Sequence, residues 1–123
     1  MKRLLLLLLI AMSASVLSAQ AMRKAIEQMP DTIFPLLERN DWLDMLDEKE
    51  ANVPAKVKNR FGKEVEMTQL TAQEAEVVMS SALTVHFTLD SETQRITLTY
   101  TYKTTQLTEQ TTRHYSLDWK PIE

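Results

Sequence analysis

The feature that most constrains the fold is a pair of alternating segments in the second half of the chain. In residues 83–89, LTVHFTL, apolar side chains alternate with Thr and His, and residues 95–103, RITLTYTYK, repeat the pattern. Alternate residues of a strand lie on the same face of a sheet. Because the intervening DSETQ is rich in turn-forming residues, we expect an antiparallel hairpin with one apolar and one threonine-rich face. A shift of one residue would bury the threonines, so the pattern also fixes the register.

Before residue 52 the apolar residues recur at helical spacing instead. This spacing predicts a short helix over residues 21–29, ended by Pro30, and a second helix over residues 40–50 with Asn40 as its N-cap. The connecting DTIFPLLERN is ambiguous, because Pro35 could kink a helix or lie in its first turn.

Beyond Pro54 the period of the pattern changes to two. Gly62-Lys63, which contains the single glycine of the chain, is the expected turn of a first hairpin. Strands are expected at residues 55–61, 64–67, 77–79, 83–89, 95–103 and 114–119, although residues 72–76 could instead start a helical turn. The sequence therefore predicts an α+β fold in which two short N-terminal helices pack on an antiparallel meander of five to six strands.

The first residues indicate export. Lys2 and Arg3 precede an uncharged apolar run over residues 4–12, and small residues follow, which is the order found in a secretory signal peptide. Cleavage is expected after Ala19, with Ala21 as the alternative, leaving residues 20–123 as a single domain. The run is too short to span a bilayer, and with no cysteine in the chain a lipoprotein anchor has no attachment site. We therefore expect a periplasmic or secreted product without a membrane span.

The charge of the chain argues against nucleic acid as a partner. Removal of residues 1–19 takes away two basic groups and no acidic group, so the net charge of −3 becomes −5. Nucleic-acid binding needs clustered Lys and Arg. The basic residues Lys56, Lys58 and Arg60 alternate along an expected strand and are interpreted as its solvent face.

Residues 38–50, ERNDWLDMLDEKE, are crowded with carboxylates. At 100° per residue, Asp41, Asp44 and Glu48 fall on one arc of the expected helix, and Trp42 lies on a separate apolar arc. A calcium site needs six to eight oxygens from a loop that curls around the ion, and a helix face does not supply them. We interpret the stretch as the solvated side of an amphipathic helix.

Catalytic patterns are weak. His86 and His114 could form a metal site with Asp118 if their strands were neighbours, but neither H-x-x-x-H nor H-E-x-x-H spacing is present. The serines lie in no G-x-S-x-G or S-x-x-K context, and no thiol is available. The sequence therefore predicts no catalytic residue, metal or cofactor.

The threonine-rich face of the central hairpin is the surface of most interest. It could simply be the exposed side of a sheet, since threonine is a favourable polar residue in strands. It could instead be a hydroxyl-rich platform for a polar ligand or a protein, and a sheet edge could recruit another chain by strand addition. The residues assigned to this possible interaction surface are Thr84, His86, Thr88, Thr97, Thr99 and Thr101.

Three segments together resemble a known family. They are AMRKAIEQMPDTIFPLLERNDWLDMLD at residues 21–47, AKVKNRFGKEVEMTQLT at residues 55–71 and HYSLDWKP at residues 114–121. In this order they resemble exported proteins of Bacteroidales-type gut and oral bacteria, labelled domain of unknown function 3256. Family members commonly have a second glycine where Lys63 stands and a tyrosine near Glu74, so the pairing order of the middle strands is left open. The resemblance implies an envelope location and no established activity.

These observations favour a non-enzymatic binding or interaction module of the bacterial cell envelope, whose partner is an unknown protein or polar ligand. The alternative is a small metal-dependent or acid–base hydrolase. A third possibility is a structural subunit whose partner completes its core.

Overall fold

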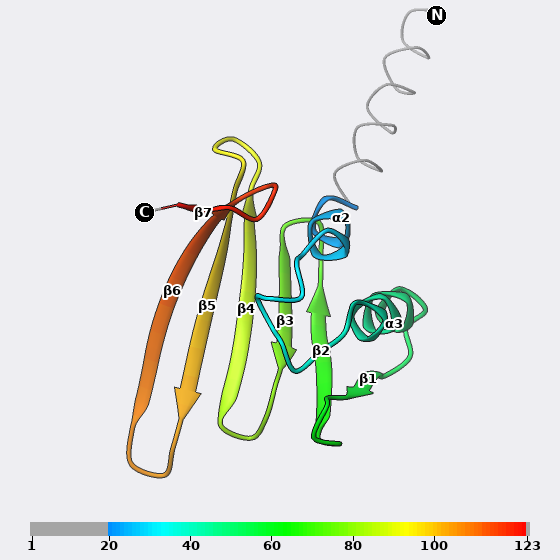
Figure 1. The fold of residues 1–123 in the computed structure, drawn as a ribbon, viewed down its shortest axis with the longest axis vertical. Helices are drawn as coiled ribbons and strands as arrows, with labels where there is room; N and C mark the ends of the chain where they lie inside the picture. Colours follow the sequence, from blue (N-terminus) through cyan, green and yellow to red (C-terminus); the bar gives the residue numbers. More distant parts are fainter. Residues whose placement is uncertain (1–19, 123) are drawn as a thin grey trace, which may run out of the picture.

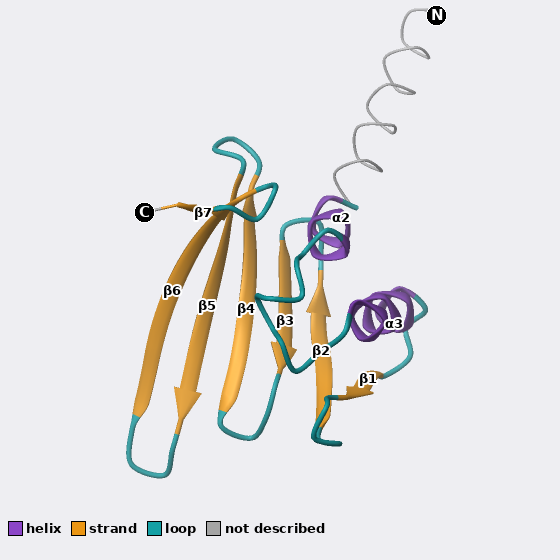
Figure 2. Cartoon of the chain, in the orientation of Figure 1, coloured by secondary structure: helices purple, strands orange, loops and turns teal. Residues whose placement is uncertain are grey.

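The computed structural model describes residues 20–122, so the predicted signal peptide, residues 1–19, lies outside the described residues. Within residues 20–122, two helices precede seven strands, which pair in chain order, each antiparallel to the next (Figures 1 and 2). The elements are α2 (Ala21–Glu27), α3 (Arg39–Glu50), β1 (Ala55–Lys58), β2 (Glu64–Leu70), β3 (Glu74–Val78), β4 (Leu83–Asp90), β5 (Arg95–Lys103), β6 (Thr108–Ser116) and β7 (Pro121–Ile122). The α+β class, the two helices and the antiparallel meander are confirmed.

The predicted number of five to six strands is wrong, because β7 adds a seventh. This strand has two residues, too few to show an alternating pattern. The predicted last strand, residues 114–119, is also misplaced: β6 begins at Thr108, in a segment where no strand was expected, and ends at Ser116. Its residues from 108 to 113 are exposed on both faces, so no period of two marks them.

The expected first hairpin is present but shorter than predicted. β1 ends at Lys58, and Phe61, the last residue of the predicted strand, lies in the turn with 75% of its surface exposed. Gly62 has a φ of 75°, a backbone conformation that glycine adopts without steric cost. The middle strands, whose order the sequence left open, also pair consecutively, and residues 74–78 form a strand rather than a helical turn.

The second helix begins at Arg39, and its N-cap lies two residues earlier than predicted. Glu38, not Asn40, is the N-cap of α3, and its backbone N–H donates to the Asp41 carboxylate over 2.9 Å. An acidic residue three positions after the cap supplies this acceptor, so the cap is fixed by Asp41. Residues 31–36, around Pro35, form turns and no helix.

Both helices cover the same face of the sheet, here called the inner face. α3 packs on β1 and β2, and α2 contacts α3 and β4. At the centre of this layer Phe34 lies 5.4 Å from Trp42 and 6.0 Å from Phe87 between ring centroids, and all three side chains are buried. Trp42 and Phe87 make an edge contact at 5.8 Å, so aromatic packing joins α3 and the segment before it to the sheet.

Two polar contacts hold α2 in place. The Arg23 guanidinium pairs with Glu27 on its own helix and, at 2.6 Å and 2.8 Å, with Asp47 and Glu50 of α3. These carboxylates raise the pKa of Arg23 above its ordinary value, so the link stays charged. At the other end of the chain, the buried indole N–H of Trp119 donates to the carbonyl of Ala25 over 2.8 Å.

Candidate functional site on the outer face of the sheet

The six residues predicted to form an interaction surface lie together on the outer face, the side of the sheet opposite the helices. Thr84, His86 and Thr88 of β4 lie directly across from β5 residues. The three cross-strand pairs are Thr84 with Thr101, His86 with Thr99 and Thr88 with Thr97. Residues directly opposite one another in an antiparallel pair project to the same face, so the register assembles a continuous patch of five hydroxyls and one imidazole.

Neighbouring strands widen this patch on both sides. On β3, Glu74 lies opposite Thr88 and Glu76 opposite His86. On the far side, three β6 residues continue the rows of β5: Gln110 opposite Thr101, Thr112 opposite Thr99 and His114 opposite Thr97. The outer face is thus acidic around β3 and rich in neutral hydrogen-bonding groups across β5 and β6.

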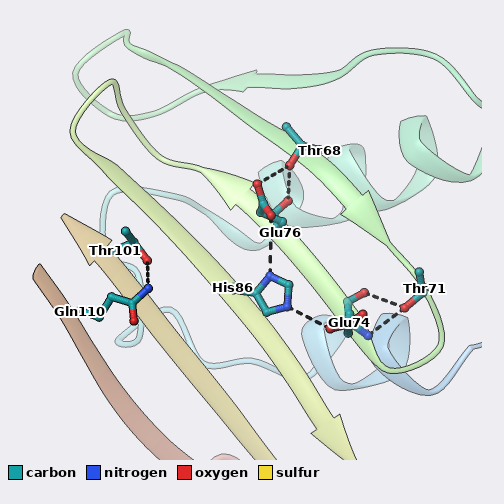
Figure 3. A network of polar contacts seen from close by, with 7 residues as sticks. All are labelled: Thr68, Thr71, Glu74, Glu76, His86, Thr101 and Gln110. Carbon is teal, nitrogen blue, oxygen red and sulfur yellow. Dashed lines mark hydrogen bonds and ion pairs between the residues drawn. The ribbon is translucent and has the colours of Figure 1, made fainter. Parts of the chain in front are cut away.

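His86 is the most connected side chain of the outer face. Its Nε2 lies 3.2 Å from a Glu74 carboxylate oxygen and its Nδ1 lies 3.7 Å from Glu76, so two carboxylates bracket the ring (Figure 3). Glu76 also accepts a 3.3 Å hydrogen bond from the Thr68 hydroxyl of β2, which fixes its orientation (Figure 3).

The three residues considered for a metal site do not come together. His86 and His114 lie on β4 and β6, which β5 separates, so their strands are about 10 Å apart. The register also offsets the two residues by two positions along the strands, because His86 pairs with Thr99 and His114 with Thr97. The ring of His114 is hydrogen-bonded to the Thr97 hydroxyl over 2.9 Å. Asp118 lies in the turn after β6 and accepts a hydrogen bond from Ser116. Across residues 20–122, no group of three or more His, Asp or Glu side chains is placed to hold a metal ion.

The acidic stretch of residues 38–50 has the amphipathic arrangement expected of it. Trp42, Met45 and Leu46 are buried, while Asp44 and Asp47 face solvent, and Asp47 binds Arg23. Three of the carboxylates line a groove of about 490 Å³ between α3 and β1, but two lysines line it as well. The groove is lined by Asp41, Asp44, Glu48, Lys56, Val57, Lys58 and Glu64.

Glu74 and Glu76 were missed by the sequence analysis. They fall in the segment where a strand and a helical turn were both possible. The alternation of Glu74, Glu76 and Val78 with the fully buried Ala75 and Val77 is the signal that could have placed these carboxylates beside the hairpin.

A family model described as "Protein of unknown function (DUF3256)" matches residues 14–123. The chain belongs to this family. No curated protein and no solved structure is significantly similar to this chain. Membership in DUF3256 therefore confirms the predicted family, and the match brings no assigned ligand or reaction. Within the described part of this DUF3256 chain, no helix has the length and apolarity needed to cross a membrane.

Proposed function

We propose that this DUF3256 protein is an exported, non-enzymatic binding module of a Bacteroidales-type cell envelope, periplasmic or secreted, which contacts a protein or polar ligand through its outer face. The observation that carries the proposal is the register of β4 and β5. It brings all six predicted surface residues into three adjacent pairs on the face opposite the helices, where each of the six is partly exposed.

The chemistry of the face suits recognition rather than turnover. Threonine hydroxyls donate and accept hydrogen bonds, and the amide of Gln110 does the same. Rigid strands hold these groups at fixed spacing, which favours a ligand with a repeating pattern of polar groups. His86 is bracketed by two carboxylates, so its nitrogens serve to order the patch.

Capture from an envelope extract tests the proposal. Thr99→Arg places a bulky charge at the centre of the patch, on a position that projects to solvent, whereas Thr105→Arg makes the same change in the exposed β5–β6 turn. We expect one set of partners to be recovered with the wild type and with Thr105→Arg, and lost with Thr99→Arg. Equal recovery with all three proteins would refute binding through the outer face.

The proposed export is tested separately. N-terminal sequencing of the protein from culture fractions should give Gln20 as the first residue, or Met22 if cleavage follows Ala21. An intact Met1 on the abundant cellular form would contradict export.

A further inference from the structure

The edge of β6 that points away from β5 is the longest unpaired strand edge in the described part of the chain. β6 pairs with β5 along its whole length, but with β7 only at His114 and Tyr115. In Figure 1, β6 borders the sheet, and the short β7 lies at one end of it. Residues 108–113 are all exposed. This edge therefore presents backbone donors and acceptors to solvent.

The backbone groups that face this open edge can be assigned. The N–H of Ser116 donates to the carbonyl of Lys120 over 2.9 Å, toward the β7 side. Because successive residues of a strand direct their backbone groups to opposite edges, Thr108, Gln110 and Thr112 also face the open side. A hydrogen bond of β5 supports this assignment. The N–H of Lys103, the β5 residue opposite Thr108, donates to the carbonyl of Ala82 and so points away from β6.

The two edges of the sheet differ in how they are protected. β1 is four residues long, carries Lys56 and Lys58, and packs against α3. Short length, lysines and covering elements are the usual means of blocking edge pairing. Residues 108–113 of β6, TEQTTR, contain no proline or lysine, are rich in a residue that favours strands, and pair with β5 without a bulge.

We propose that the β6 edge pairs antiparallel with the same edge of a second copy of this chain, forming a symmetric dimer with one continuous sheet. The two-fold axis passes through Thr111. Gln110 then lies opposite Thr112 of the second copy, and each pair exchanges two backbone hydrogen bonds. Glu109 lies opposite Arg113 of the second copy, twice by symmetry, in the closer, non-hydrogen-bonded type of pair.

Charge selects this register over its neighbours. An axis through Gln110 would place Glu109 opposite Thr111 and Arg113 opposite Leu107, so neither charge would be matched. An axis through Thr112 would place Arg113 opposite Thr111 and Glu109 opposite Tyr115, so again neither charge would be matched. Only the axis through Thr111 pairs both charges, and its paired segment is residues 109–113, because Thr108 would lie opposite His114, which is paired with Ile122 of β7.

The dimer would join the two outer faces into one platform, because a two-fold axis perpendicular to the sheet keeps both helix layers on the same side. The dimer proposal does not depend on the proposed ligand binding. A protein that dimerises but captures no partner would support only the dimer, and a monomer that captures a partner would support only the ligand binding. The paired segment is short, so we expect a weak dimer that forms in the micromolar range or above.

Sedimentation equilibrium of the full protein over about three decades of concentration tests the proposal. Glu109→Arg and Arg113→Glu each create two like-charge pairs and should weaken the dimer about ten-fold or more. The double variant, Glu109→Arg with Arg113→Glu, restores opposite charges and should return the dissociation constant to near the wild-type value. Glu92→Arg, the same charge change in the exposed β4–β5 turn, is the matched control and should have no effect.

A backbone variant tests the edge itself. Thr112→Pro removes an N–H that faces the open side and leaves the β5 ladder intact, so it should abolish the dimer while circular dichroism retains the strand signal. A wild-type protein that stays monomeric throughout would overturn the proposal. A dimer that survives Thr112→Pro, or that the double charge exchange does not restore, would overturn it as well.

Discussion

The sheet has a covered half and an uncovered end. On β4, under the helices, the inner-facing Val85 and Phe87 are completely buried. On β6, the inner-facing Glu109, Thr111 and Arg113 are all exposed, although this strand is equally regular and pairs with β5 throughout. Strand geometry is the same in both regions, so the helix layer determines which inner-facing side chains are buried.

The comparison also shows how a sequence adapts to missing cover. Where helices lie above the inner face, the strands alternate apolar and polar residues; beyond the helices, β6 turns polar on both faces. A strand without apolar cover is held by its hydrogen-bonded neighbour alone, which leaves its other edge free for a partner.

The largest expected difference between the two regions is in core truncation. Phe87→Ala should lower the free energy of unfolding by about 3–5 kcal/mol, because it empties a fully buried aromatic site beside Phe34 and Trp42. Thr111→Ala, on the uncovered end, should cost no more than about 0.5 kcal/mol. Urea denaturation of both variants measures the contrast, and equal losses would contradict it.

Trp119 extends the covered region to the C-terminal turn, and Trp119→Phe should cost about 1–3 kcal/mol. This change removes the buried indole donor of the Ala25 carbonyl while keeping an aromatic ring. Leu117→Ala, at a 39% exposed position of the same turn, should cost less. If the two variants have the same denaturation midpoint, the indole hydrogen bond does not stabilise the fold.

Tyr100 marks the boundary between the two regions, with its ring 6.0 Å from Phe34. Partial burial raises the pKa of its phenol from 10.0 to about 12. The raised pKa contributes stability that is fully present below pH 10 and is lost as the pH rises toward 12, since the unfolded chain ionises first. The tyrosinate absorbance of the wild type minus that of Tyr100→Phe should show that the Tyr100 phenol ionises with a midpoint above pH 10. A midpoint near pH 10 would mean that the phenol is not buried.

The smallest effect is expected at the fully exposed β4–β5 turn. The Asp90 carboxylate accepts hydrogen bonds from the backbone N–H groups of Thr93 and Glu92, which lower its pKa below the ordinary value of 3.8. Its stabilising effect is therefore present above that value and is lost as the pH falls through the lowered pKa. The carboxyl chemical shift of Asp90 in an NMR titration should have a midpoint below pH 3.8. A midpoint at the ordinary value would mean that the two backbone hydrogen bonds to Asp90 are not formed in solution.

The hairpin of β4 and β5 and its six outward residues could be predicted from sequence because a strict period of two admits one register. The helices were equally readable from their apolar spacing, to within two residues at each end. β6 could not be located, since its residues 108–113 are polar on both faces and therefore carry no period. Glu74 and Glu76 were missed for a different reason: their short segment fitted a strand or a helical turn, and only pairing with β4 resolves it.

The bond between Trp119 and Ala25 links the last turn of the chain to its first described helix, across 94 positions. Consecutive hairpins can form one after another during synthesis, because each needs only residues close in sequence. The hydrogen bond that Trp119 donates to α2 can form only after the end of the chain has been made. For the exported protein proposed above, this contact between the two ends of the domain would therefore be among the last to form.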